Sequence, residues 1–418
     1  MIGKWKGEET MNQPNVQRRP VLVVGAGPIG LTAALALRHF GLPATVIEAE
    51  PKDRLRPGSR AIYFHKATLQ HLEDIFPGLG RTFAKHGVVW PIKRTLFRGK
   101  EVYMKRYPAP DPNALPPFTS LPQVEAEKFL YQACLEAGVE FVWETPVADV
   151  KTDEEGATVI TASGEQWSCD YLIAADGARS TVRQSVGIEM EGPRTKDYFV
   201  VVDVKEDEAD PLPLERVFHY QHPAVGGRNV LFVPFAGGWR IDLQLLDGDD
   251  PEQFGSVDGV KQWLPKVMPE KYADRITWVS TYRFFQVVAK SLTDRHHRVL
   301  LAGEAAHLFA PLGARGMNSG VPDAIMAAKA IQTALQANTR EEAKAAIAAA
   351  ANERLIAARY NRDCAGIALE HIQGTDPAIN MKREVAASLA PILPRLGKWL
   401  DEGPYGPKSG PPQLSTKY

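Results

Sequence analysis

The chain has 418 residues, and its contents of 44% hydrophobic and 24% charged residues are close to those of ordinary globular proteins. The formal net charge is -1, and the sequence contains no long run of charges of one sign. Both observations argue against nucleic acid or an anionic membrane surface as a partner. No apolar run is long enough to cross a bilayer, and the N-terminal segment lacks the apolar core of a secretion signal. We therefore expect a cytoplasmic protein with one large domain and a second lobe, acting on a small molecule.

The cysteines and the N-terminal segment give little information about function. Cys134, Cys169 and Cys364 lie far apart and form neither a CxxC pair nor a metal-ligand cluster, so we expect incidental or buried thiols and no metal. The polar residues 1–19 are expected to form a flexible tail.

A strand, a glycine-rich turn, a helix and a second strand are predicted near the N-terminus. The strands are the apolar runs 20–24 and 44–48, and the helix between them ends at Gly41. The turn carries a G-x-G-x-x-G motif, made of Gly25, Gly27 and Gly30 with Pro28 and Ile29 before the last glycine. Such a turn lets a pyrophosphate approach the backbone at a helix N-terminus, and Glu48 is placed to accept hydrogen bonds from ribose hydroxyls. The motif predicts a bound dinucleotide and leaves FAD and NAD both open.

The remaining elements fall into two kinds of pattern. Helices are predicted at 65–76 and 125–137, strands at 140–143 and 171–175, and a hairpin over 147–163. Strand-like runs separated by Gly or Asp turns fill residues 197–290 and predict a separate antiparallel sheet. A strand at 298–302 and two Ala-rich helices near 319–337 and 340–372 follow, and the Pro- and Gly-rich end from 403 is expected to be loosely held.

Four segments, taken in order, resemble the single-component FAD-dependent aromatic hydroxylases, the para-hydroxybenzoate hydroxylase family. They are the glycine motif with Glu48, then Gly58-Ser59-Arg60-Ala61, then Asp176-Gly177-Ala178-Arg179-Ser180, and finally GEAAHLFAPLGARGMNSGVPDA from Gly303. The resemblance covers about residues 20–335, and it favours FAD over NAD as the dinucleotide.

The resemblance implies roles for residues outside the glycine motif. Arg60 would reach the FAD pyrophosphate, and Gln123 would contact the ribitol. Asp176 and Gly177 would lie where the flavin and the nicotinamide cofactor are both handled. Arg179 and Arg183 complete this pattern. For Arg183, however, we expect a solvated charge at the surface.

The last segment matches the loop that passes beside the isoalloxazine ring. Its matching residues are Pro311, Gly313, Gly316, Met317 and Asn318. Small residues let the backbone lie against the ring, and N–H groups at a helix start stabilise the negative charge of reduced flavin. The family usually has Gly-Asp where this chain has Gly303-Glu304, so the longer Glu304 must fold back or displace the ribitol. His307 is expected to be structural.

The resemblance also implies the reaction. NADPH or NADH would reduce FAD, O₂ would add at the flavin C4a position, and the resulting hydroperoxide would pass an oxygen to a small phenolic substrate. Candidate substrate contacts on the antiparallel sheet are His219, Tyr220 and His222, with Arg240 as a possible carboxylate partner. Strand alternation predicts His219 on one face and Tyr220 and His222 on the other.

The expected fold is α/β. A Rossmann-like FAD-binding domain would comprise 20–196 and 291–372 with C-terminal helices, an inserted, mainly antiparallel substrate domain would comprise 197–290, and a C-terminal segment would comprise 373–418. A Baeyer–Villiger oxygenase and a non-catalytic FAD-binding protein stay open as alternatives. A flavin-dependent halogenase is disfavoured because the Trp-x-Trp-x-Ile-Pro segment is absent. Monomer and homodimer stay open.

Overall fold

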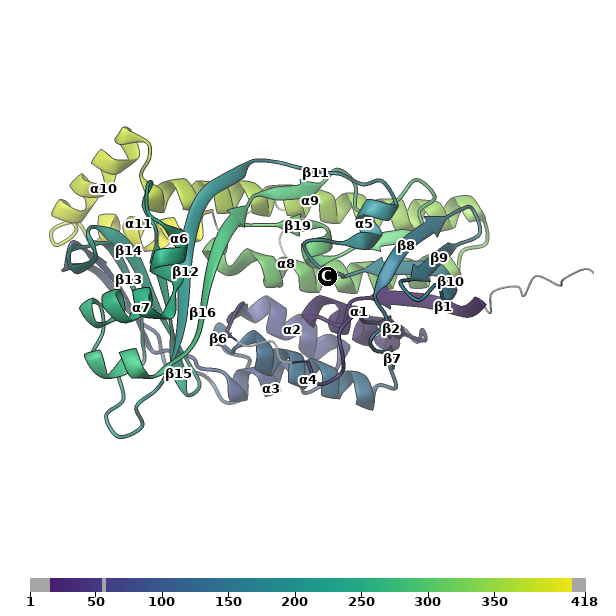
Figure 1. Ribbon diagram of the computed structural model, residues 1–418, viewed down its shortest axis with the longest axis horizontal. Coiled ribbons are helices and arrows are strands. Elements are labelled where there is room, and N and C mark those ends of the chain that lie inside the picture. The colour runs from purple at the N-terminus through teal and green to yellow at the C-terminus, as the bar shows by residue number, and fades with distance from the viewer. Residues whose placement is uncertain (1–15, 55–57, 408–418) are drawn as a thin grey trace, which may run out of the picture.

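The chain forms two lobes that are joined by long strands and by one long helix (Figure 1). The computed structural model describes residues 16–54 and 58–407, with the backbone alone at 194–197. Within this part of the chain, no helix is both long and apolar enough to cross a membrane.

The first lobe is built on a seven-stranded sheet with the order β7-β2-β1-β10-β9-β8, in which β18 also pairs with β10. Its strands are β1 (Val16–Val24), β2 (Thr45–Ile47), β7 (Glu140–Val142), β8 (Val147–Thr152), β9 (Ala157–Thr161), β10 (Gln166–Ala174) and β18 (Val299–Leu301). β1 runs parallel to both β2 and β10, and its residues 21–24 are at most 5% exposed. Burial on both faces is what a central parallel strand with an all-apolar sequence requires, so the predicted Rossmann-like domain is confirmed.

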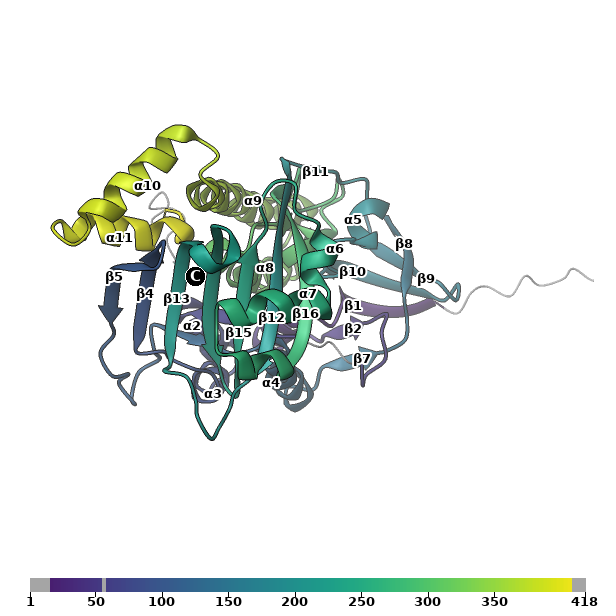
Figure 2. The same cartoon turned by 60° about the vertical axis from the view of Figure 1, so that its left-hand side comes forward.

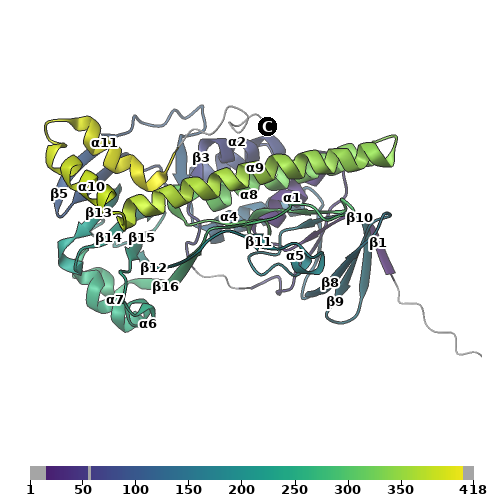
Figure 3. The same ribbon diagram turned by 90° about the horizontal axis from the view of Figure 1, so that it is seen from above.

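Helices layer against this sheet and against each other. The helices of the first lobe are α1 (Pro28–His39), α2 (Lys66–Ile75), α3 (Leu79–His86), α4 (Gln123–Glu136), α5 (Thr181–Ser185), α8 (Arg315–Leu335) and α9 (Arg340–Gln373). α1 contacts α4 and α8, and α8 packs along α9. α9 begins at a capping box formed by Thr339 and Glu342, ends at the left-handed Gly374, and runs along both lobes (Figure 3).

The second lobe is a seven-stranded sheet with the order β16-β12-β15-β14-β13-β4-β5 (Figure 2). Its strands are β4 (Ile92–Phe97), β5 (Lys100–Arg106), β12 (Arg194–Lys205), β13 (Glu215–His222), β14 (Arg228–Phe235), β15 (Gly238–Gln244) and β16 (Ile276–Phe285). One face of this sheet carries valine-rich apolar side chains. They form a core with residues of α7 (Val257–Trp263), which follows α6 (Pro251–Gly255). The other face carries polar side chains that bond to the first lobe, among them Asp203 and Arg240. The active site is therefore expected between this polar face and the first lobe.

Two small sheets complete the junction between the lobes. β11 (Met190–Glu191), β17 (Val287–Ala289) and β19 (His307–Leu308) form one, and β3 (Tyr63–His65) pairs with β6 (Phe118–Ser120) in the other.

The structure differs from the expected boundaries in three places. The sheet of the second lobe extends beyond 197–290, because β4 and β5 join it and β4 runs parallel to β13. The expected tail 1–19 is wrong at its end, since β1 already pairs with β10 at Val16, while residues 1–15 lie outside the described part. The end expected to be loosely held from 403 forms a 3-10 turn at Gly403–Tyr405, and before it α10 (Pro377–Leu389) and α11 (Pro394–Glu402) pack on the second lobe.

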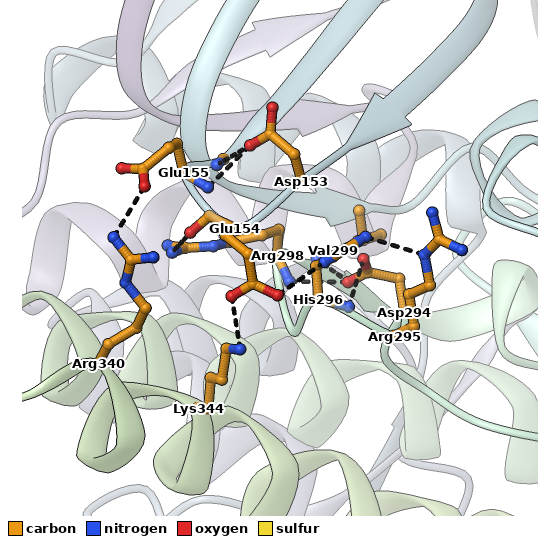
Figure 4. Close-up of polar contacts among 11 residues, drawn as sticks. Asp153, Glu154, Glu155, Asp294, Arg295, His296, Arg298, Val299, Arg340 and Lys344 are labelled. Atoms are coloured by element: carbon orange, nitrogen blue, oxygen red, sulfur yellow. Dashed lines mark hydrogen bonds and ion pairs between the residues drawn. The ribbon is translucent and has the colours of Figure 1, made fainter.

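Ion pairs tie the β8–β9 hairpin to the start of α9 (Figure 4). Glu154 pairs with Lys344 at 2.6 Å and with His296 at 3.1 Å, and Glu155 pairs with Arg340 at 2.8 Å. Hydrogen bonds from Lys344 and His296 lower the pKa of Glu154 to about 2. Because exposed ion pairs contribute little stability singly, this cluster orients the hairpin rather than holding the fold together.

Candidate functional site

The glycine motif forms a turn that no larger residues could form. Gly25 has a left-handed backbone with φ of 101°, and its N–H donates to the carbonyl oxygen of Ile47 at 2.8 Å. A Cβ on Gly25 would lie 2.4 Å from the Ala175 carbonyl oxygen, and a Cβ on Gly30 would lie 1.9 Å from the Gly25 carbonyl oxygen. The turn therefore brings β1, α1 and the end of β10 into direct backbone contact.

The N-terminus of α1 offers donors for an anion. Gly27 stands before the helix with no side-chain cap, Pro28 occupies the first turn, and the first intrahelical bond runs from the Leu31 N–H to the Gly27 carbonyl oxygen at 2.9 Å. The N–H groups of Ile29 and Gly30 thus have no intrahelical acceptor. Free N–H groups and the positive end of the helix dipole suit a pyrophosphate.

Glu48 is fixed beside this turn. Its carboxylate accepts the N–H of Ala26 at 2.5 Å and the N–H of Glu50 at 3.0 Å, and the residue is 5% exposed. The position at the end of β2 agrees with the expected one, and contact with a ribose stays a prediction.

The loop that carries Arg60 is held by both lobes. Ser59 donates from its N–H and its hydroxyl to Asp203 at 2.5 and 2.7 Å, and Arg240 donates to the Arg60 carbonyl oxygen. The N–H of Gln123 donates to the Ser59 carbonyl oxygen at 2.9 Å. The structure thus brings Arg60 and Gln123 together and leaves the Arg60 side chain exposed.

Asp176 follows β10, next to the glycine turn. Its Oδ2 accepts the Val182 N–H at 3.0 Å, whereas its buried Oδ1 has no hydrogen-bond partner among the described residues. Burial raises the pKa of Asp176, and hydrogen bonds from Ser180 and the backbone act against that rise. A buried acceptor without a donor is uncommon in native proteins and suits contact with a ligand. The prediction of a solvated Arg183 is wrong, because this side chain is buried and donates to the Ala305 carbonyl oxygen at 3.1 Å.

Asp323 on α8 holds the segment at Gly303 in place through hydrogen bonds. It accepts from the Gly303 N–H at 3.2 Å, from His307 Nε2 at 2.6 Å and from Arg354 Nε at 2.7 Å. Burial acts to raise the pKa of Asp323, but Arg354 and His307 hold it below its usual value. The contacts of His307 agree with the structural role expected for it. The sequence analysis did not identify Asp323, although it stands inside the quoted GVPDA segment.

Glu304 points away from this network. It is exposed, while Gly303 and Ala305 on either side are buried. Desolvation by the protein around the carboxyl group raises its pKa, and the charges of His307 and Arg60 act against that rise. Arg60 and Glu304, from two separate motifs, therefore lie within range of each other's charge.

The loop before α8 passes through two left-handed residues, Gly313 with φ of 74° and Ala314 with φ of 55°. A Cβ on Gly313 would lie 2.7 Å from the carbonyl oxygen of Tyr405, so a larger residue would displace the C-terminal segment. Arg315 donates to that same oxygen at 3.0 Å. Pro311 is exposed, as is Gly316 in the first turn of α8.

Asn318 joins the start of α8 to β3. Its side-chain oxygen accepts the His65 N–H at 3.1 Å and the Thr68 hydroxyl at 2.6 Å, and its amide donates to the Tyr63 carbonyl oxygen at 2.8 Å. The neighbouring Met317 packs against the apolar core of the first lobe. The side chain of Asn318 is thus occupied by the protein, which leaves backbone groups for any contact with the flavin.

Two candidate substrate residues are engaged in protein contacts. The buried Tyr220 donates its hydroxyl to the Leu400 carbonyl oxygen at 2.7 Å, with His371 Nε2 at 3.0 Å from that hydroxyl. Arg240 forms a two-pronged pair with Asp242 at 2.6 and 3.2 Å. These contacts describe structural positions, and substrate contact by either residue stays a prediction.

His219 and His222 lie side by side, with ring centroids 4.1 Å apart. The predicted alternation is wrong here because Gln221 adopts a left-handed φ of 48° and the register of β13 with β14 shifts between the two histidines. His219 accepts the Gly99 N–H at 2.9 Å, and burial, then His222, lowers its pKa to about 4. A neutral His219 imidazole that already accepts a hydrogen bond has no free site for a phenol proton, which argues against His219 as a base. A catalytic role for His219 or His222 stays a prediction.

The residues that converge at this junction fit FAD. A Cβ on Gly30 would collide with the Gly25 backbone, and a Cβ on Gly303 would lie 2.9 Å from the Ile29 side chain. An uncapped helix start, an exposed Arg60, and the unpaired oxygen of Asp176 surround the same region. Donors for phosphates and acceptors for hydroxyls are what the dinucleotide requires.

Comparisons with known proteins agree with this site. The family described as "FAD binding domain" matches residues 18–360. Para-nitrophenol 4-monooxygenase of Pseudomonas sp. (strain WBC-3) is 31% identical over 330 residues, which cover 74% of this chain and 77% of that one. The 6-methylpretetramide 4-monooxygenase of Streptomyces rimosus is 30% identical over 79% of this chain but 58% of its own length.

Solved structures show the same fold. The crystal structure of p-nitrophenol 4-monooxygenase PnpA from Pseudomonas putida DLL-E4 superposes with a TM-score of 0.76 at 22% identity and covers 94% of this chain and all of that one. The family match and the curated relatives together place the chain: it belongs to the FAD-dependent aromatic hydroxylases that share this FAD-binding domain.

Proposed function

We propose that the protein hydroxylates a small phenolic substrate, using FAD, O₂ and NADPH or NADH. The observation that carries the proposal is the continuous chain of contacts between the motifs. Gly25 touches the segment of Asp176, Ile29 packs on Gly303, and the start of α8 is bonded to β3 just after Arg60. Relatives named as aromatic monooxygenases support the choice of reaction.

Each part of the site has a distinct task in this reaction. Bound FAD supplies electron transfer from the nicotinamide and the activation of O₂. The N-terminus of α1 and Arg60 bind its pyrophosphate, and Glu48 accepts from its ribose. The N–H groups at the start of α8 stabilise negative charge on the ring. The polar face of the second-lobe sheet positions the substrate and limits the access of water.

Product analysis tests the reaction. Protein loaded with FAD is mixed with NADPH or NADH and a panel of phenols, and the cofactor oxidation is compared with the product mass. We expect substrate-stimulated oxidation and the gain of one oxygen on the ring. A lactone or ester from a ketone would support Baeyer–Villiger oxygenation instead, and yellow protein without turnover on any compound would support a non-catalytic FAD-binding protein.

A matched pair of arginine variants tests the cofactor site. Arg60→Gln removes an exposed charge at the proposed pyrophosphate contact, and Arg340→Gln removes an exposed charge on α9 that pairs with Glu155. The first should weaken FAD binding by about tenfold or more, whereas the second should leave it unchanged. Equal FAD affinities in both variants would contradict the placement of the pyrophosphate. A cytoplasmic location and a monomeric or homodimeric state are part of the proposal and are measured by fractionation and by light scattering.

A further inference from the structure

A row of cations crosses the inner face of the second-lobe sheet. In the strand register, Arg216 on β13 lies opposite Lys93 on β4. The registers of β13 with β14 and of β14 with β15 place Arg240 on β15 in the same row. β13 and β15 are separated by one strand, so the backbones of Arg216 and Arg240 lie roughly 10 Å apart. Arg240 bonds to the loop of Arg60, so one end of this row lies at the loop that is proposed to contact FAD.

The outer two cations of this row are neutralised. Lys93 forms a buried ion pair with Asp401, and Arg240 pairs with Asp242. Arg216 is 5% exposed, its Nη1 has no hydrogen-bond partner, and no described residue forms an ion pair with it. Arg216 is therefore a buried guanidinium without a carboxylate.

Two aromatic rings, rather than a carboxylate, lie beside the Arg216 guanidinium. Its guanidinium carbon lies 5.6 Å from the centroid of Phe218 and 5.1 Å from that of Tyr405. Cation–π contacts recover only part of the free energy that a cation loses when it leaves water. A buried charge without a protein partner lowers stability, and proteins retain such groups where a bound ligand supplies the partner.

The position of Arg216 joins the sheet to the loop before α8. Tyr405, which covers Arg216, accepts a hydrogen bond from Arg315 at the start of α8. Burial raises the pKa of Tyr63, and the charge of Arg216 acts against that rise, so the two groups are close. The Tyr63 carbonyl oxygen in turn accepts from Asn318. Arg216 thus lies near the loop before α8 and among the rings of Phe218, Tyr405 and Tyr63.

We propose that Arg216 binds a negatively charged oxygen group of the aromatic substrate, a carboxylate or a phenolate. The guanidinium fork matches a carboxylate with two parallel hydrogen bonds and a phenolate with one. The inference deepens the proposed function and rests on it for the oxidation of the bound ring. It names the substrate class as anionic phenols and assigns to Arg216 the role that the sequence had suggested for Arg240.

Binding to the FAD-loaded protein tests the assignment directly. Benzoate and its neutral isostere benzamide are titrated, with the flavin absorbance as the readout, into the unchanged protein, Arg216→Gln and Arg216→Lys. Arg94→Gln is the matched control, because Arg94 lies on the neighbouring strand but pairs with Glu215 and Glu101. Phenol is titrated on both sides of its own pKa to separate the phenolate from the carboxylate.

Arg216→Gln should weaken benzoate or phenolate binding by about tenfold to a hundredfold and change benzamide binding less than twofold. Arg216→Lys should recover part of the loss, and Arg94→Gln should show none. A selective loss for benzoate assigns the carboxylate, and a loss for phenol confined to high pH assigns the phenolate. Equal effects on charged and neutral ligands, or no effect on any, overturn the proposal.

Thermal unfolding without an aromatic ligand separates binding from a structural role. Removal of an unpaired buried charge should leave the unfolding temperature of Arg216→Gln unchanged or raise it. A clear fall would indicate that Arg216 supports the fold and would overturn the proposal. If no aromatic compound stimulates NADPH or NADH oxidation in the unchanged protein, the proposed function fails, while the comparison of benzoate with benzamide still decides the role of Arg216.

Discussion

Replacing Asp323 by asparagine removes a charge that accepts hydrogen bonds from three groups beside the proposed FAD site. The carboxylate is 2% exposed and accepts from Arg354, His307 and the Gly303 N–H at 2.7, 2.6 and 3.2 Å. Asparagine keeps the shape but puts an NH₂ group where an oxygen accepted. Arg354 then loses the charge of the Asp323 carboxylate, and at least one donor faces another donor.

The expected cost follows from the burial. Breaking a buried ion pair by neutralising one partner costs about 3–5 kcal/mol. For a chain of this length, the unfolding entropy converts this loss to a fall of about 3–6 °C in the unfolding temperature. Because Gly303 loses its anchor, FAD affinity should fall as well. Both are measured on the same protein, by thermal unfolding at a fixed scan rate and by FAD titration.

Glu154→Gln is the control for this prediction. Glu154 also contacts a cation and a histidine, Lys344 and His296, but its side chain is 48% exposed. Exposed pairs are screened by water, so its unfolding temperature and FAD affinity should hardly change. If Asp323→Asn and Glu154→Gln shift the unfolding temperature equally, the buried network does not support the site as argued.

Three further perturbations have defined outcomes. Gly30→Ala puts a Cβ 1.9 Å from the Gly25 carbonyl oxygen and should weaken FAD binding by about tenfold or more, as a fluorescence titration would reveal; an unchanged affinity would rule out the tight turn. Arg240→Met removes a donor to Arg60 and should weaken FAD binding, whereas a change confined to the substrate KM would revive its predicted substrate contact. Burial and then Arg383 lower the pKa of His371 to about 4. Between pH 6.5 and 4 only the unfolded chain takes up a proton at His371, so stability should fall by up to about 3 kcal/mol on acidification. His371→Gln should flatten that part of the pH profile of denaturant unfolding, and an unaltered slope would contradict the shift.

Local patterns predicted the first lobe well. The apolar run before Gly25 became a strand buried on both faces, and the Ala-rich stretches became α8 and α9. The joining of β4 to β13 could not be predicted, because a parallel pairing across more than a hundred residues is set by tertiary packing and not by local alternation. The helices α10 and α11 were not predicted within the C-terminal segment 373–418, and their packing on the second lobe accounts for them.

Motif order predicted the glycines and charges of the proposed FAD site, but it did not predict the arrangement of the substrate side. Strand alternation failed at Gln221, where a left-handed residue brings His219 and His222 together. Arg216 had a signal that went unused: it alternates with Phe218 and Tyr220, so it lies on the buried face of β13. Whether such a cation has an acidic partner is decided by distant elements, here by α11 and the turn at Tyr405, and is visible only in the structure.

The proposed reaction transfers one atom of O₂ to an aromatic ring. The most direct test supplies ¹⁸O₂ and NADPH or NADH to the FAD-loaded protein with anionic phenols, and measures the mass of the product. One ¹⁸O atom on the ring, formed only with the substrate, the reductant and FAD present, is the predicted result. Reductant oxidation that yields hydrogen peroxide alone with every phenol, or a product whose new oxygen comes from water, would contradict it.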